Sequence, residues 1–188
     1  MKRFLASVCC IALCTIPALA KGKAAAKGAV MSDQQFVDFA AQTDMVEANL
    51  GQLAGDVAAT QPVKDYAQML VTDHTNDYHH LQDVAQQAGF TVPPAINAEN
   101  NKKMIGPFHA LKGAAFDHRY IPEMVSGHEK AIAIFKKEAA DAQNPALKEY
   151  AEQTLPVLAK HLHAAEDLQK GDTAGATALE NGQMPAMK

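Results

Sequence analysis

Five titratable residues interrupt helical stripes that are otherwise largely apolar, and their side-chain types suit metal coordination. They are Glu47, His74, Asp77, His128 and His161. Imidazole and carboxylate groups together are suitable ligands for iron, zinc, manganese or copper. Burying such groups in an apolar interior is costly unless they pair, form hydrogen bonds or bind an ion. These positions therefore define the candidate functional site of the chain.

The heights of the five residues along their helices also agree. Each lies within about one turn of the midpoint of an expected helix. The four expected helices span residues 32–59, 62–88, 114–141 and 145–170. When helices are aligned side by side, their midpoints form one layer whichever way each helix runs. We therefore expect one polar layer within the apolar interior.

Two interpretations of this layer remain open at the level of sequence. In the first, Glu47, His74, His128 and His161 bind one transition-metal ion, and Asp77 and Glu129 are second-tier ligands. In the second, Glu47 and Asp77 accept hydrogen bonds from the three histidines, and the network fixes the register of the helices without a ligand. Both interpretations place the same side chains in the interior.

The elements that position these residues have clear start and stop signals. Apolar residues recur at alternating intervals of three and four, as on one face of a helix. Ser32 and Gln35 form a capping box that begins the first helix. Asn144 caps the fourth helix, and Gly89 and Gly171 end the second and fourth helices. No stretch of the chain shows the alternation of a strand.

An internal similarity predicts how the helices are connected. The segment Lys64-Asp65-Tyr66-Ala67 recurs as Lys148-Glu149-Tyr150-Ala151, so one helical hairpin is used twice. Residues 90–112 contain several prolines and glycines and form a long connection between helices two and three. The expected fold is all-α, a four-helix bundle built from two αα-hairpins with this long connection between them.

The two ends of the chain are expected to lie outside the bundle of residues 32–170. Residues 1–20 have a basic start, an apolar run and the cleavage sequence Ala18-Leu19-Ala20, as in a signal peptide. Residues 21–31 form a basic leader, and residues 171–188 form a disordered tail. We therefore expect the protein to be exported to the periplasm; association with the outer membrane and secretion are the alternatives. An uncleaved membrane anchor is the rival interpretation of residues 1–20.

Composition excludes several classes of function. The net charge is −4 and no large basic cluster is present, so we expect no nucleic-acid partner. All three cysteines lie within residues 1–20, and the cleaved protein has no thiolate ligand, disulfide or transmembrane anchor. No hydrolase triad or nucleotide-binding glycine loop occurs. A homo-oligomer, an envelope protein or a small molecule remain as partners.

Four motifs together resemble a known protein family. They are Glu47, Thr72-Asp73-His74-Thr75, His128-Glu129-Lys130-Ala131, and the run from Leu155-Pro156 through Leu158 to His161. The segment from Asp33 to about Leu168 resembles exported bacterial ferritin-like four-helix domains of unknown function, described as periplasmic or outer-membrane proteins. The resemblance implies a ferritin-like bundle in the cell envelope and no established reaction.

The chain departs from the di-iron pattern of ferritin-like proteins. In that pattern, two helices each carry a glutamate and the other two each carry Glu-x-x-His. Here Val71 and Leu158 stand three residues before His74 and His161, so two bridging carboxylates are missing. A conventional di-iron oxidase or iron store is therefore not expected. The remaining hypotheses are an envelope protein that binds one metal, with a redox or stress-related role, and a non-catalytic helical interaction module.

Overall fold

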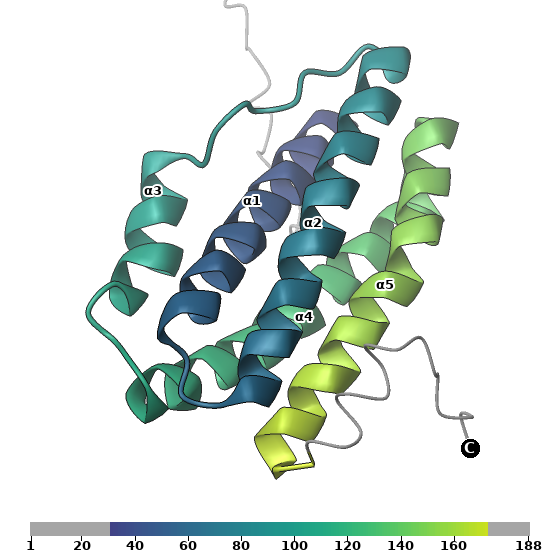
Figure 1. Cartoon of the computed structure of the whole chain (residues 1–188). Helices are drawn as coiled ribbons and strands as arrows, with labels where there is room; N and C mark the ends of the chain where they lie inside the picture. The colour runs from purple at the N-terminus through teal and green to yellow at the C-terminus, as the bar shows by residue number, and fades with distance from the viewer. Residues whose placement is uncertain (1–30, 173–188) are drawn as a thin grey trace, which may run out of the picture. The chain divides into compact units, whose positions relative to one another are not determined.

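The computed structural model describes residues 31–172, and this part of the chain contains helices and no strand (Figure 1). The long helices are α1 (Asp33–Val57), α2 (Gln61–Ala88), α4 (Ala114–Asp141) and α5 (Pro145–Lys170). The expectation of an all-α chain is confirmed, and the four expected helices agree with the observed bounds to within two residues. The proposed signal peptide, most of the leader and most of the tail lie outside the described residues.

Local signals in the sequence account for the helix ends. The Ser32 hydroxyl accepts from the Gln35 backbone N–H and the Gln35 side chain accepts from the Ser32 N–H, so the capping box is confirmed. The Asn144 side chain accepts from the Ala146 N–H. Gly89 and Gly171 have φ of 81° and 80°, a left-handed conformation that glycine adopts without strain. These caps set where each helix begins and ends.

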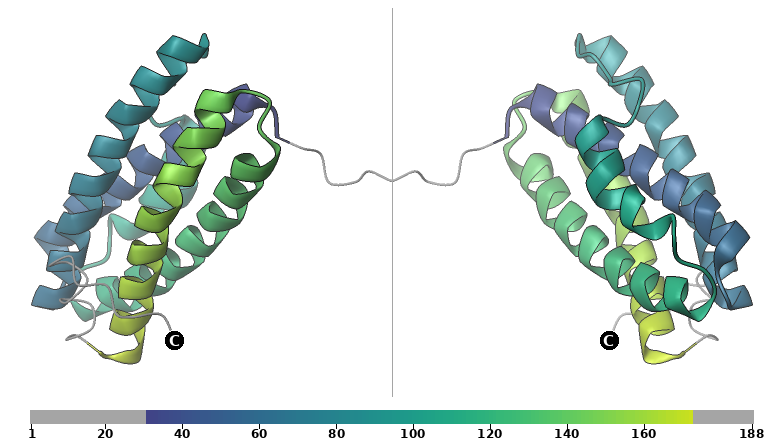
Figure 2. Two further views of the ribbon diagram at one scale, coloured as in Figure 1. Left: turned by 90° about the vertical axis from the view of Figure 1, so that its right-hand side faces the viewer. Right: turned by 90° about the vertical axis from the view of Figure 1, so that its left-hand side faces the viewer.

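The long helices pack as two hairpins. α1 lies along α2 and α4 lies along α5, and the hairpins meet where α2 contacts α5 and α1 contacts α4 (Figures 1 and 2). The connection between the hairpins contains α3 (Ala98–Asn100), the π-helical η1 (Asn101–Ile105) and the 3₁₀ turn η2 (Gly106–Phe108). It runs beside α1, which η1 contacts. The expected long connection between helices two and three is therefore present.

The apolar interior consists of two clusters with polar residues between them. One cluster joins the α1–α2 turn, the connection and the start of α4, and includes Tyr66 and Tyr120. The other joins the opposite ends of the same helices and includes Phe36, Phe135 and Tyr150. In sequence, each buried histidine lies between residues of the first cluster and residues of the second. The expected polar layer at mid-height is therefore present in the interior.

Within residues 31–172, no helix is long and apolar enough to cross a membrane.

A buried carboxyl group lies at the end of the hairpin formed by α4 and α5. Glu138 is 6% exposed, and its Oε1 atom has no hydrogen-bond partner. Burial, assisted by the charges of Asp33 and Asp141, raises the pKa of Glu138 from its ordinary value of 4.5 to about 7. Asp33 is fixed in place because its carboxylate accepts from the backbone N–H groups of Gln143 and Asn144.

The raised pKa of Glu138 predicts a pH-dependent gain in stability for Glu138→Gln. Below pH 4.5 the carboxyl is protonated in both the folded and unfolded states and contributes no penalty. As the pH rises from 4.5 to about 7, the unfolded chain ionises first, so the folded state loses stability. We expect Glu138→Gln to raise the free energy of unfolding by about 1–3 kcal/mol at pH 8 and by little at pH 4.

Urea denaturation followed by circular dichroism at both pH values measures this difference. Glu152→Gln, which changes an exposed carboxyl group on α5, is the control and should have little effect at either pH. An equal change in the free energy of unfolding for Glu138→Gln at pH 4 and pH 8 would contradict the raised pKa of Glu138.

Candidate metal centre

Three histidines from three helices meet in the polar layer. His74 on α2, His128 on α4 and His161 on α5 are 2%, 1% and 0% exposed. Their ring centroids are 5.1–5.8 Å apart in each pair. One nitrogen from each ring can be chosen so that all three atoms lie within 4.8 Å of one another. We call His74, His128 and His161 the histidine triad.

Each ring of the triad is held by a hydrogen bond at one nitrogen. His74 Nδ1 lies 2.9 Å from Asp44 Oδ1. His161 Nε2 lies 2.9 Å from Asp73 Oδ2. His128 Nδ1 lies 2.8 Å from the Met124 carbonyl oxygen, which can only accept. Acceptors of this kind fix the orientation of a metal-binding imidazole.

Within residues 31–172, the other nitrogen of each ring has no hydrogen-bond partner. His74 Nε2, His128 Nε2 and His161 Nδ1 are all buried without a hydrogen bond. Burial lowers the pKa of His128 well below 6.5 and that of His161 to about 4, so both rings are neutral at neutral pH. Because a carbonyl oxygen can only accept, His128 Nδ1 carries the hydrogen and donates the hydrogen bond. In the neutral ring, Nε2 then has no hydrogen and presents a lone pair. One nitrogen from each ring lies within 4.8 Å of the others, so the three rings could hold a cation.

Two acidic residues hold these rings through hydrogen bonds, and the Asp73 carboxylate opposes the fall in the pKa of His161 that burial causes. The pKa of Asp73 is lowered by its hydrogen bond with His161, so Asp73 is ionised and accepts from His161 Nε2–H. Burial raises the pKa of Asp44 and lowers the pKa of His74, which opposes a charged pair. A cation bound at His74 Nε2 would favour the tautomer in which Nδ1–H donates to Asp44.

Glu47 lies beside the triad on α1. It is 6% exposed, and its Oε2 atom is buried without a partner. Burial raises its pKa to about 7, and the neighbouring His74 opposes this rise. A Cβ atom added at Gly127 on α4 would lie 3.3 Å from Glu47 Oε1, so the missing side chain leaves room for this carboxylate.

Neither second-tier residue belongs to the triad, although the charge of Asp77 acts on His74. Asp77 accepts hydrogen bonds from the Tyr150 hydroxyl at 2.7 Å and the Thr154 hydroxyl at 3.2 Å. Glu129 is exposed on the surface of α4. The structure thus brings together three of the four first-tier residues, with Glu47 next to them, and gives Asp77 a separate set of partners.

The hydrogen bonds differ from those expected for a purely structural network. That interpretation assigns Glu47 and Asp77 as acceptors for the histidines, whereas the rings bond to Asp44, Asp73 and the Met124 carbonyl. Asp44 is not among the site residues expected from the sequence, although an interval of four from Ala40 followed by three to Glu47 includes it. Asp73 is not among the expected site residues either. It is next to His74 in sequence, but its hydrogen-bond partner is His161 on α5.

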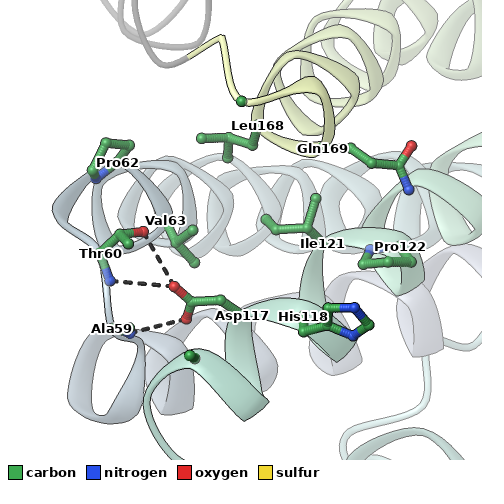
Figure 3. A pocket seen from close by; sticks show the side chains of 12 residues that line it. Ala59, Thr60, Pro62, Val63, Asp117, His118, Ile121, Pro122, Leu168 and Gln169 are labelled. Carbon is green, nitrogen blue, oxygen red and sulfur yellow. Dashed lines mark hydrogen bonds between the residues drawn. The ribbon is translucent and has the colours of Figure 1, made fainter.

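A separate pocket of about 710 Å³ lies at one end of the helices (Figure 3). Its wall is mainly apolar and includes Val63, Ile121 and Leu168, and no member of the histidine triad lines it. Asp117 at its edge accepts from the N–H groups of Ala59 and Thr60 and from the Thr60 hydroxyl. These bonds cap the start of α2, where the Thr60 side chain makes no cap of its own. Asp117 therefore has a structural role here.

Comparison with known proteins identifies a family without an assigned function. The family described as "Domain of unknown function (DUF4142)" matches residues 18–168, which include every residue of the site. Comparison with curated proteins and with solved structures gave no match.

The bare nitrogen of His128 predicts the effect of removing this ring from the metal-free protein. His128→Leu replaces an unsatisfied buried group with an apolar one and leaves no other side chain without its partner. We expect the free energy of unfolding without metal to stay within about 1 kcal/mol of the wild type, or to rise. Chemical denaturation in the presence of a chelator measures this free energy of unfolding. A loss above about 3 kcal/mol would instead identify His128 as part of a bonded network.

Proposed function

Because the chain belongs to this family of unknown function, we propose its function from the geometry of the site: the domain binds one transition-metal ion through His74, His128 and His161. One observation carries the proposal. Three buried imidazole nitrogens lack hydrogen-bond partners, and one nitrogen of each ring lies within 4.8 Å of the others. A bound cation satisfies all three at once, and the ionised carboxylate of Asp73 favours positive charge there.

The spacing of the triad is compatible with a metal ion after small movements. Metal–nitrogen bonds of 2.0–2.1 Å in a tetrahedral site place the ligand nitrogens about 3.3 Å apart. Nitrogens up to 4.8 Å apart must therefore approach one another by up to about 1.5 Å, which rotations of their side chains can supply. Three imidazoles leave a fourth position open. Glu47, whose Oε2 has no partner, is not within the 4.8 Å group, so it takes this position only by moving closer to the three rings.

The ligand types favour zinc, iron, manganese or copper. A single ion fits better than a pair, because Val71 and Leu158 provide no carboxylate one turn before His74 and His161. The arrangement of the hairpins supports a ferritin-like four-helix bundle with a long crossover as the scaffold. When bound, the ion supplies a Lewis acid held within a dry interior.

The proposal predicts one equivalent of metal per chain. We expect His161→Ala to abolish stoichiometric binding, because it removes one of three ligands. Asp44→Asn should keep the ligands but weaken binding about 10- to 100-fold, because His74 loses the carboxylate that orients it. Metal titration of chelator-treated protein followed by elemental analysis measures both.

His79→Ala is the matched control, because His79 lies on the same helix as His74 but is exposed. Binding in this variant should equal that of the wild type. If wild-type protein takes up no iron, zinc, manganese or copper, or if His161→Ala binds as well as wild type, the proposal is wrong.

We further propose that residues 1–20 direct export and that the domain works in the periplasm. Lys2 and Arg3 followed by an apolar run and Ala18-Leu19-Ala20 support this assignment. We expect the protein from the periplasmic fraction to begin at Lys21, which intact-mass analysis measures. Full-length protein retained in the membrane fraction would instead support an uncleaved anchor.

A further inference from the structure

The histidine triad is so well buried that a metal ion needs a way in. The three rings are at most 2% exposed. Asp44 and Asp73 bond to the nitrogens that face away from the candidate ion, so the rings themselves separate these acids from the bare nitrogens. Any route must therefore reach the triad from a direction that neither acid occupies.

Glu47 offers such a direction, where α1 faces α4. Its carboxylate is close enough to His74 for the two charges to interact, so it lies next to the triad. Its other neighbour on this side is Gly127, which is half-buried rather than buried. Because Gly127 has no side chain, the Glu47 Oε1 atom lies close to the backbone of α4 at this point. A methyl group there would approach the carboxylate oxygen to 3.3 Å, which is a tight contact.

A second carboxylate, that of Glu123, lies closer to solvent than Glu47. Glu123 precedes Gly127 by four residues on α4, so the two residues are neighbours on one face of the helix. Glu123 is half-exposed, and its charge acts on Glu47. The side chains Glu123, Glu47 and His74 thus form a series from solvent to the triad, with a glycine beside it.

We propose that metal ions enter the site between α1 and α4 beside Gly127, attracted by Glu123 and transferred through Glu47 to the histidine triad. This inference rests on the proposed metal-binding function and adds the route and the residues that control it. Carboxylates along a path raise the local concentration of a cation and so its association rate. The glycine keeps the path free of a side chain. Gly127 and Glu123 thus act on the rate of uptake, while the triad determines the affinity.

Stopped-flow measurement of Co²⁺ uptake by chelator-treated, full-length protein tests the route. We expect Gly127→Ala to slow uptake several-fold and Gly127→Leu at least tenfold, with the final stoichiometry unchanged. Glu123→Gln should slow uptake and weaken its dependence on salt, because one attracting charge is removed. Replacing glycine with alanine within a helix is itself favourable by about 0.5–1 kcal/mol, so Gly127→Ala should fold.

Gly55→Ala is the matched control. Gly55 is also a helical glycine, and an added Cβ there has no atom within 4 Å. This variant should take up Co²⁺ at the wild-type rate. Wild-type uptake rates in Gly127→Leu would overturn the proposed route while leaving the metal site intact. Loss of Co²⁺ binding at equilibrium in Gly127→Ala would also overturn the proposed route, because Gly127 would then affect the affinity of the site and not only the rate of uptake. No uptake by the wild type would overturn the proposed function itself.

Discussion

The arrangement of this domain depends on one costly feature, three imidazoles that meet in a dry interior with one nitrogen each left bare. An unsatisfied buried polar group costs about 1–3 kcal/mol, so three of them are a large burden for a domain whose net stability is of the order of 5–15 kcal/mol. The apolar clusters on either side of the layer supply the compensating burial. A cation held by the three nitrogens would remove the cost, because it gives each lone pair a partner.

The rest of the domain positions and orients these rings. Two hairpins bring α2, α4 and α5 into contact at mid-height, and the caps that begin and end the helices set the register. The rings are then fixed by three different acceptors, two carboxylates and one backbone carbonyl. One consequence is an unequal ligand set, in which His74 and His128 present Nε2 whereas His161 presents Nδ1. α1 contributes Asp44, whose carboxylate bonds to His74 Nδ1, and Glu47, whose charge acts on the same ring.

Periodicity and capping signals were sufficient to predict the helices, because both are local properties of the chain. The polar layer was also predictable, since residues near the midpoints of aligned helices must lie at similar heights. The hydrogen-bond partners were not predictable in this way. Asp73 follows Thr72 and precedes His74 in sequence, yet it binds His161 on another helix, and only the rotation of α2 against α5 determines that choice. Asp77 illustrates the reverse case: it shares the face of His74, but Tyr150 and Thr154 from α5 engage its carboxylate.

The most direct test of the account is the position of a bound ion in crystals of metal-loaded protein. Anomalous diffraction collected at the zinc absorption edge locates zinc independently of the protein atoms. The account predicts one strong peak about 2.0–2.1 Å from His74 Nε2, His128 Nε2 and His161 Nδ1. It would be contradicted by zinc bound only at surface histidines, with water molecules hydrogen-bonded to the three buried nitrogens in its place.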